Sequence, residues 1–210
     1  MKTEALIRVL AADVGRPTRG IREQLGLAWA AGAAGSLLLF GLLLGPRANL
    51  GSTFHDFDFV LKVVCMACLA VTAALQLDTL ARPARRSRGL RRLGFAPLLL
   101  IAAVFLELGT SPPQTWLASM VGRNAIVCLV AIPVLSAPSA LLLMWALKRG
   151  APTSPRQAGA TAGLAAGGVG ACLYAFFCPI DNPLFVATWY PLAIGTVSAT
   201  CALGGRWLRW

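Results

Sequence analysis

Ionisable side chains are scarce in this chain of 210 residues, of which only 13% are charged. Soluble domains average about 25% charged residues, so the composition argues against a soluble protein. Eight acidic residues and one histidine, His55, leave few groups for acid–base catalysis. No nucleophile motif surrounds a serine, which argues against a Ser/His/Asp hydrolase. We therefore expect a protein that is not an enzyme and that needs no cofactor.

A cleavable signal peptide is also missing from the beginning of the sequence. The first 24 residues contain Glu4, Asp13 and Glu23 and no apolar core stretch, whereas a signal peptide needs an uninterrupted apolar segment. We therefore expect residues 1–24 to stay on the protein as a separate N-terminal segment.

Long apolar runs dominate the rest of the chain, which is 57% hydrophobic overall. A run of about 18 or more apolar residues is typical of a membrane span. We predict an all-α, polytopic membrane protein in which residues 25–210 form a bundle of six transmembrane helices in a lipid bilayer. The predicted spans are residues 25–45, 57–77, 93–109, 123–147, 158–178 and 186–204.

The basic residues predict the orientation of this bundle. All but three of the 19 Lys and Arg residues lie in the N-terminal segment, in the second and fourth loops, and at the C-terminus. Six spans place these four regions on one side, and the positive-inside rule makes that side cytoplasmic. We therefore predict a bacterial inner-membrane protein with both termini in the cytoplasm. The net charge of +11 then needs no nucleic-acid partner, because the basic residues separate apolar runs.

The fifth predicted span is rich in small residues, with Gly159, Gly163 and Gly167 four residues apart. Small residues at this spacing let another helix approach closely, so we interpret this span as a packing helix.

The N-terminal segment has an amphipathic pattern. Leu6, Ile7, Leu10 and Val14 fall at helical spacing and form one apolar stripe. Two interpretations remain open from the residues alone: a helix that rests on the membrane surface, and a helix that docks on a cytoplasmic partner.

Two of the six cysteines differ from the others in predicted depth. Cys128 precedes Lys148 by 20 residues and Cys178 follows Gln157 by 21, which places both about 30 Å from the loop between their helices. That distance is the hydrocarbon thickness, so both thiols reach the outer boundary, on neighbouring helices. The remaining cysteines lie deeper, and we expect them to fill space as small apolar residues. They are Cys65, Cys68, Cys172 and Cys201.

The periplasm is oxidising, and thiols there are chemically meaningful. We predict that Cys128 and Cys178 form a sensing pair that binds a soft metal transiently or forms a disulfide.

The C-terminal half resembles a known family. The resemblance starts at Gly122-Arg123-Asn124 and Cys128-Leu129, and Gly45-Pro46-Arg47-Ala48-Asn49-Leu50 resembles a Gly-x-Arg-x-Asp-Leu loop of the same family. The later segments that carry it are Leu147–Thr153, Ala158–Gly167, Tyr174, Cys178, Trp189-Tyr190 and Leu208-Arg209-Trp210. The family is NrsF, the negative regulators of extracytoplasmic-function sigma factors. Asn49 stands where an acidic residue is common in that loop.

This resemblance implies an integral-membrane anti-sigma factor with six spans. It would hold a cognate extracytoplasmic-function sigma factor at the membrane and release it under heavy-metal or oxidative stress. The two periplasm-facing cysteines of the family match Cys128 and Cys178. Its sigma-binding segment matches residues 1–24, with Leu6, Ile7, Leu10 and Val14 as the candidate contacts.

Two rival functions are a membrane thiol oxidoreductase and a small transporter, for instance of metal. The oxidoreductase needs an exchange-competent CxxC in an outer loop, and the one CxxC, Cys65 to Cys68, lies inside a predicted span. The transporter needs ionisable residues at the bilayer midplane, and the sequence places none there convincingly.

Overall fold

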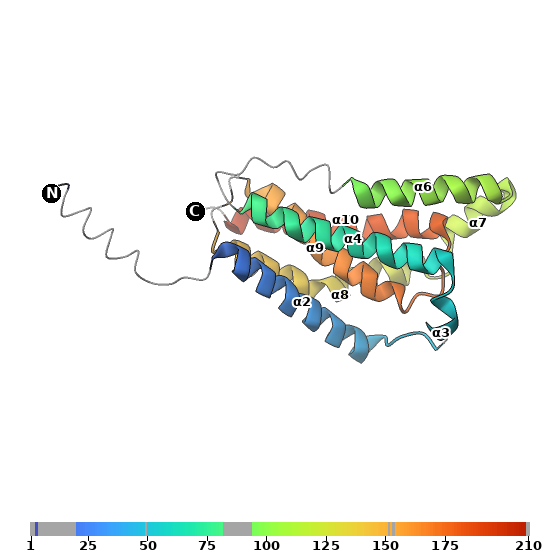
Figure 1. Ribbon diagram of the computed structural model, residues 1–210, viewed down its shortest axis with the longest axis horizontal. Helices are drawn as coiled ribbons and strands as arrows, with labels where there is room; N and C mark the ends of the chain where they lie inside the picture. Colours follow the sequence, from blue (N-terminus) through green and yellow to red (C-terminus); the bar gives the residue numbers. More distant parts are fainter. Residues whose placement is uncertain are drawn as a thin grey trace.

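The computed structural model describes Thr3 and residues 20–48, 50–81, 94–150, 152 and 154–208. Within these ranges all regular secondary structure is helical, which confirms the predicted all-α class. The helices lie side by side as an elongated bundle (Figure 1). The long helices are α2 (Ile21–Leu43), α4 (Phe57–Leu80), α8 (Ala125–Leu147), α9 (Pro155–Ala175) and α10 (Pro183–Gly204). The shorter elements are α3 (Leu50–Thr53), α6 (Phe95–Thr110), η1 (Pro113–Thr115), α7 (Trp116–Val121) and η2 (Gly205–Leu208).

The five long helices are long and apolar enough to cross a membrane, with mean hydropathy between 1.3 and 2.4. They coincide with five of the six predicted spans. The predicted span 93–109 corresponds to α6, which has 16 residues. At about 1.5 Å per residue this helix extends about 24 Å, less than the hydrocarbon thickness of about 30 Å. The described residues thus hold five helices that could cross a membrane and one shorter apolar helix, and a total of six spans stays a prediction.

The two ends of the bundle are defined by where its loops meet. At one end, the proximal end, Gly150 lies beside Ile21 and the carbonyl of Ala81, and Gly205 packs on Pro155. The opposite end, the distal end, holds the connections after α2, α6 and α9 (Figure 1). Helices α2, α6 and α9 therefore run from the proximal to the distal end, and α4, α8 and α10 run in the opposite direction.

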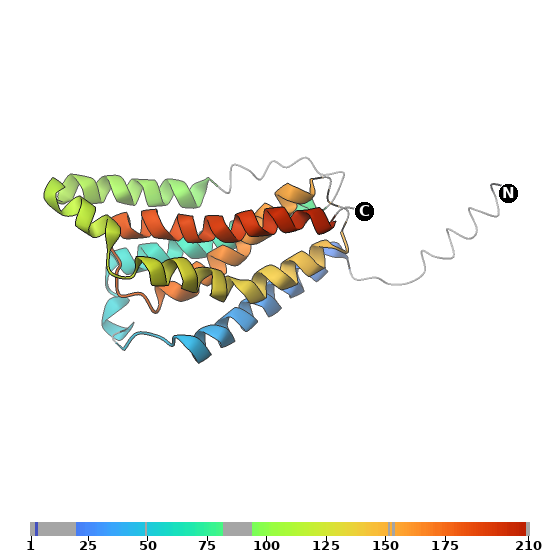
Figure 2. The ribbon, with the colours of Figure 1, turned by 180° about the vertical axis from the view of Figure 1, so that it is seen from behind.

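Helix α9 is the centre of the bundle, with α4, α8 and α10 packed around it (Figure 2). A Cβ atom on Gly163 would lie 2.5 Å from the Cα of Ser198 on α10. One on Gly168 would lie 2.8 Å from the backbone nitrogen of Ala70 on α4, and one on Gly170 would lie 2.7 Å from the carbonyl oxygen of Ile132 on α8. Three neighbouring backbones thus approach α9 where it lacks side chains, which confirms the predicted packing role.

Helix α2 packs mainly on α8 rather than on α4. Gly32 of α2 lies against the backbone of Ser139 on α8. One turn further along α2, the buried hydroxyls of Ser36 and Ser139 are 2.9 Å apart. Hydrogen bonds between such hydroxyls join membrane helices that have no hydrophobic force between them.

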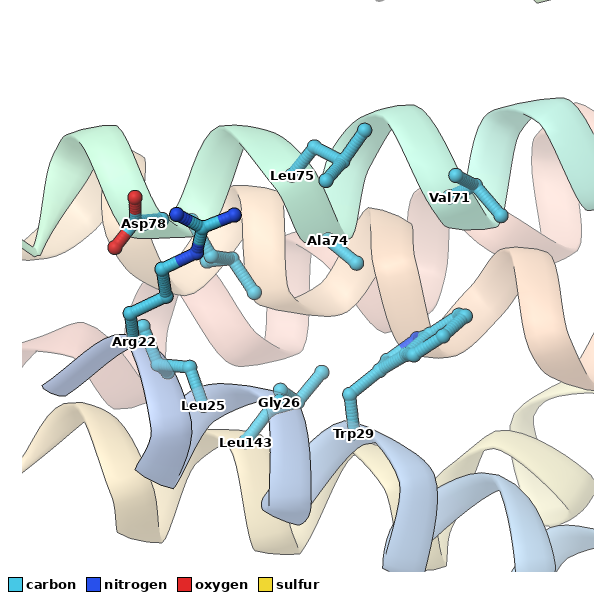
Figure 3. Close-up of a pocket in the computed structure, with 10 residues that line it drawn as sticks. Arg22, Leu25, Gly26, Trp29, Val71, Ala74, Leu75, Asp78 and Leu143 are labelled. Carbon is cyan, nitrogen blue, oxygen red and sulfur yellow. The ribbon is translucent and has the colours of Figure 1, made fainter. Parts of the chain in front are cut away.

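A cavity of about 170 Å³ lies between α2 and α4 near the proximal end. Leu25 and Trp29 line it from α2, and Leu75 lines it from α4. Arg22 and Asp78 approach each other across one edge of this cavity (Figure 3). Its walls are largely apolar, so it is a packing gap between two membrane helices rather than a polar binding site.

Candidate functional site

The candidate site lies at the distal end, around the connection between α9 and α10 (residues 176–182). This α9–α10 connection begins where α9 ends at Ala175, so the helix ends three residues before the predicted span 158–178 does. Its last residue, Asn182, caps α10, because its Oδ1 accepts a hydrogen bond of 2.9 Å from the backbone N–H of Leu184. Cys178 therefore lies in a structured turn and not on α9.

The structure brings the two predicted sensing cysteines together in one cluster. Cys128 is in the first turn of α8, Cys178 is in the α9–α10 connection, and both belong to the same buried hydrophobic cluster. Both thiols are free and have 0% of their surface exposed. The sequence predicted thiols at the outer boundary of the membrane, and the structure encloses both at the distal end among Tyr174, Phe185 and other core residues. Their role in sensing is not tested by this geometry and stays a prediction.

The other cysteines are distributed along the bundle. Cys65 and Cys68 are neighbours on α4, and Cys172 is on α9. Cys201, on α10, packs with its backbone against Gly159, towards the proximal end. All four are free thiols, and their positions suit the predicted role of small apolar filler.

Two tyrosines complete the surroundings of the cysteine pair. Tyr174, in the last turn of α9, and Tyr190, on α10, both have 0% exposure, and their ring centroids are 6.0 Å apart. Each phenol is an electrostatic neighbour of both Cys128 and Cys178. Neither hydroxyl forms a hydrogen bond with any part of the chain that the structure describes. In the sequence they were part of the family resemblance and carried no predicted role.

A buried ion cluster holds the α9–α10 connection against α2 and α4. The carboxylate of Asp181 is 2.5 Å from Nζ of Lys62 on α4 and 2.9 Å from Nη1 of Arg47, which follows α2. The side chain of Lys62 has 0% exposure and that of Asp181 has 18%. Both cations also donate to the carbonyl oxygen of Cys178 at 3.3 Å, and Lys62 donates to that of Ile180 at 3.3 Å. Sequence reasoning missed this cluster.

Two aromatic rings, of Phe59 and Phe176, pack beside the cations. The guanidinium carbon of Arg47 lies 4.6 Å from the ring centroid of Phe59, at a distance typical of cation–π contacts. Phe59 in turn meets Phe176 edge to face, with 5.7 Å between ring centroids. The backbone N–H of Arg47 donates to the carbonyl of Phe176 at 3.1 Å. The arginine of the resembling loop therefore fixes the end of α2 to the α9–α10 connection.

Helix α6 is attached to the same connection. Asn182 donates from Nδ2 to Oε1 of Glu107 at 2.9 Å, and Ser111 donates to the same oxygen at 2.7 Å. The acidic group of α6 near the distal end is thus a structural partner of the α9–α10 connection.

His55, Asp56 and Asp58, which lie close together in the sequence, do not form a metal centre. Across the described ranges no three His, Cys, Asp or Glu residues gather closely enough to hold a metal ion. A metal at the distal end would therefore depend on the two thiols. The predicted contacts with the sigma factor lie outside the described residues, so their role stays a prediction. They are Leu6, Ile7, Leu10 and Val14.

Comparison with known proteins decides the family. Residues 10–210 match the family described as "Negative regulator of sigma F". This protein belongs to the NrsF family. It is 33% identical over 214 residues to the anti-sigma-F factor NrsF of Caulobacter vibrioides, and 100% of each chain is covered. It is 34% identical over 220 residues to a probable anti-sigma-F factor NrsF of Azospira oryzae, again over 100% of both chains. No solved structure matches the chain. Membership in the NrsF family confirms the resemblance carried by the motifs of the sequence.

Proposed function

We propose that this protein is an anti-sigma factor that holds a sigma factor inactive at the membrane. The observation that carries this proposal is the match over the whole chain to NrsF relatives that are named anti-sigma-F factors. Membership in a family of negative regulators supports a regulatory and non-enzymatic role. The partner we propose is a sigma factor of the extracytoplasmic-function type.

The bundle sits in the inner membrane with its proximal end in the cytoplasm and with six spans, α6 included. Basic residues support this orientation, since cytoplasmic loops are rich in Lys and Arg. The described basic residues at the proximal end are Arg22, Lys148, Arg149, Arg156 and Arg206. Both termini then face the compartment that contains the sigma factor.

The N-terminal segment is the part that binds the sigma factor. Its apolar stripe of Leu6, Ile7, Leu10 and Val14 suits a helix that lies in a hydrophobic groove. Helix α2 begins at Ile21, inside the predicted segment 1–24, so the segment is continuous with the bundle.

Heavy metals or oxidants release the sigma factor through Cys128 and Cys178. A soft divalent cation replaces the protons of both thiols and binds the two sulfurs, and two protons leave. A two-electron oxidant instead joins the sulfurs as a disulfide and takes up two electrons and two protons. Either product draws the beginning of α8 and the α9–α10 connection together. A ligand can shift the equilibrium between the sigma-bound and the sigma-free conformation of this protein only if it has different affinities for the two conformations.

A contiguous path leads from this pair towards the N-terminal segment. The α9–α10 connection carries Cys178 and is bonded to Arg47 at the distal end of α2. The 23-residue α2 then spans the bundle as one rigid element and begins at Ile21, next to the N-terminal segment. The path is supported by contacts, and energetic coupling along it needs a direct test.

A sigma-dependent reporter in cells tests the proposal. Deletion of the protein should raise reporter activity without any inducer. Cys128→Ser and Cys178→Ser should each change the response to cadmium or to an oxidant, whereas Cys172→Ser and Cys201→Ser serve as matched controls with the wild-type response. A reporter unaffected by the deletion would overturn the anti-sigma role. A wild-type response in both Cys128→Ser and Cys178→Ser would overturn the sensing role only.

A further inference from the structure

Two buried phenol groups, of Tyr174 and Tyr190, lie in the same core cluster as the cysteine pair. Tyr174 and Tyr190 are fully enclosed, and neither hydroxyl has a hydrogen-bond partner in the described structure. Tyr174 precedes Cys178 by four residues, and the backbone N–H of Cys178 donates to the carbonyl oxygen of Tyr174 at 2.9 Å. Buried polar groups are normally hydrogen-bonded, and an unsatisfied one costs free energy. The state with two neutral thiols therefore leaves two donors unused at the same place.

The cluster that holds both tyrosines also holds the sulfurs of Cys128 and Cys178. A thiol sulfur is a weak acceptor, whereas a thiolate sulfur carries a charge, and hydrogen bonds to charged groups are roughly twice as strong as neutral ones. The two donors are thus unsatisfied beside the thiols and would be satisfied beside two thiolates.

The carbonyl oxygen that accepts from the Cys178 thiol has a second donor. Its thiol donates to the carbonyl oxygen of Ile180, with 3.8 Å between sulfur and oxygen. That same carbonyl also accepts from Nζ of Lys62 at 3.3 Å. When the thiol proton leaves, Lys62 still satisfies the carbonyl and adds a positive charge near the sulfur.

We propose that Tyr174 and Tyr190 make the site selective for soft divalent cations, by donating hydrogen bonds to the thiolates of Cys128 and Cys178 when the metal binds. The proposal rests on the sensing function proposed above. The metal binds the two sulfurs and releases two protons, and both phenols keep theirs. Outer partners that orient and hydrogen-bond metal ligands typically contribute ten- to a hundredfold to metal affinity.

Disulfide formation gains nothing from the tyrosines. In a disulfide both sulfurs are neutral and poor acceptors, so the hydroxyls stay unsatisfied as they are with two thiols. The tyrosines therefore separate the two triggers: they favour the metal-bound state and leave the oxidised state unaffected.

The test compares metal binding with oxidation in the purified full-length protein in lipid nanodiscs. Cd²⁺ is titrated into the wild type, Tyr174→Phe, Tyr190→Phe and the double variant, and the ultraviolet charge-transfer band between sulfur and cadmium reports occupancy. Disulfide formation is measured in the same samples with diamide, which takes up two electrons and two protons to become a hydrazine. We expect the Cd²⁺ dissociation constant to rise about tenfold for each lost hydroxyl and the disulfide yield to stay unchanged.

Matched variants separate this proposal from its alternatives. Phe177→Leu changes the packing against the ring of Tyr174, whose centroid is 5.9 Å from that of Phe177, and should leave the Cd²⁺ affinity unchanged. An unchanged Cd²⁺ affinity in the double tyrosine variant overturns the proposal, and so does an equal loss of Cd²⁺ binding and disulfide formation. A charge-transfer band that persists in the Cys128→Ser, Cys178→Ser protein instead overturns the cysteine pair itself.

Discussion

The ammonium nitrogen of Lys62 lies 2.5 Å from a carboxylate oxygen of Asp181, and the side chain of Lys62 has no solvent exposure. A buried charge is stable only when it is paired and hydrogen-bonded, and here the pair fastens α4 to the turn that carries Cys178. Arg47 adds a second cation from the end of α2. The position of Cys178 is thus set by three segments that are far apart in the sequence.

Asp181→Asn should destabilise the protein strongly, because it leaves the buried ammonium of Lys62 without a counter-charge. Breaking a buried ion pair by removing one partner costs about 3–5 kcal/mol. Lys62→Met should cost less, since Asp181 keeps Arg47 and is partly exposed. Unfolding of the purified proteins in detergent measures both effects, with Lys148→Met at the exposed proximal end as control. Equal stability of Asp181→Asn and the wild type would show that the ion cluster contributes nothing.

Replacement of both Leu6 and Leu10 by Asp should release the sigma factor. The two substitutions place charge where the apolar stripe would lie in a groove, and an unpaired charge is costly to desolvate. Co-purification of the sigma factor with the full-length protein measures the effect. Glu4→Gln and Arg8→Gln, on the opposite side of the stripe, are the matched controls. Undiminished co-purification with the Leu6→Asp, Leu10→Asp protein would show that the partner binds elsewhere.

Reporter fusions should place both termini and two loops in the cytoplasm. Fusions after Arg22, Arg88, Pro155 and the C-terminus all follow basic segments that the positive-inside rule retains there. Alkaline phosphatase should be inactive at these four points, and a cytoplasmic fluorescent reporter should be active. The fusion after Pro155 decides whether α6 counts as a span, because without that span residue 155 would lie in the periplasm while Arg88 stays in the cytoplasm. A periplasmic signal at the C-terminus alone would mean that the number of spans is odd.

Gly163→Val should destabilise the bundle, because the new side chain meets the backbone of Ser198 rather than a flexible group. Overpacking of a tight core costs about 1–3 kcal/mol, and contact with backbone leaves little room for relaxation. Gly41→Val is the matched control, since a Cβ there meets nothing within 4 Å. Thermal unfolding in detergent compares the two. A Gly163→Val protein as stable as the control would mean that α9 and α10 are packed less closely than described.

The long helices were predictable because hydropathy reports directly on burial in lipid. The central position of α9 was predictable as well, since its glycines leave a surface that only another backbone can fill. The placement of Cys128 and Cys178 at the same end of the bundle followed from counting the rise per residue, although Cys178 lies just beyond the end of α9. These features depend on local composition or on counting along one helix.

The ion cluster was not predictable in this way. Lys62 is one basic residue in an apolar run, and its partner Asp181 is 119 positions away in the sequence, so no spacing rule connects them. The end of α9 at Ala175 was also missed, because Phe176 and Phe177 continue the apolar run while the backbone has already left the helix. Hydropathy does not report where helical hydrogen bonds stop.

The order of packing partners along the chain has a consequence for biosynthesis. Helix α2 finds its main partner in α8, and α4 finds its main partner in α9, although both early helices leave the ribosome well before those partners. They must therefore wait in the lipid as separate helices until the second half of the chain is inserted. The last helices then complete contacts for the first ones, so truncation after α6 would leave α2 and α4 without the surfaces on which they pack. Assembly of this protein is a late event, and a chaperone or insertase that shields α2 and α4 would act during that interval.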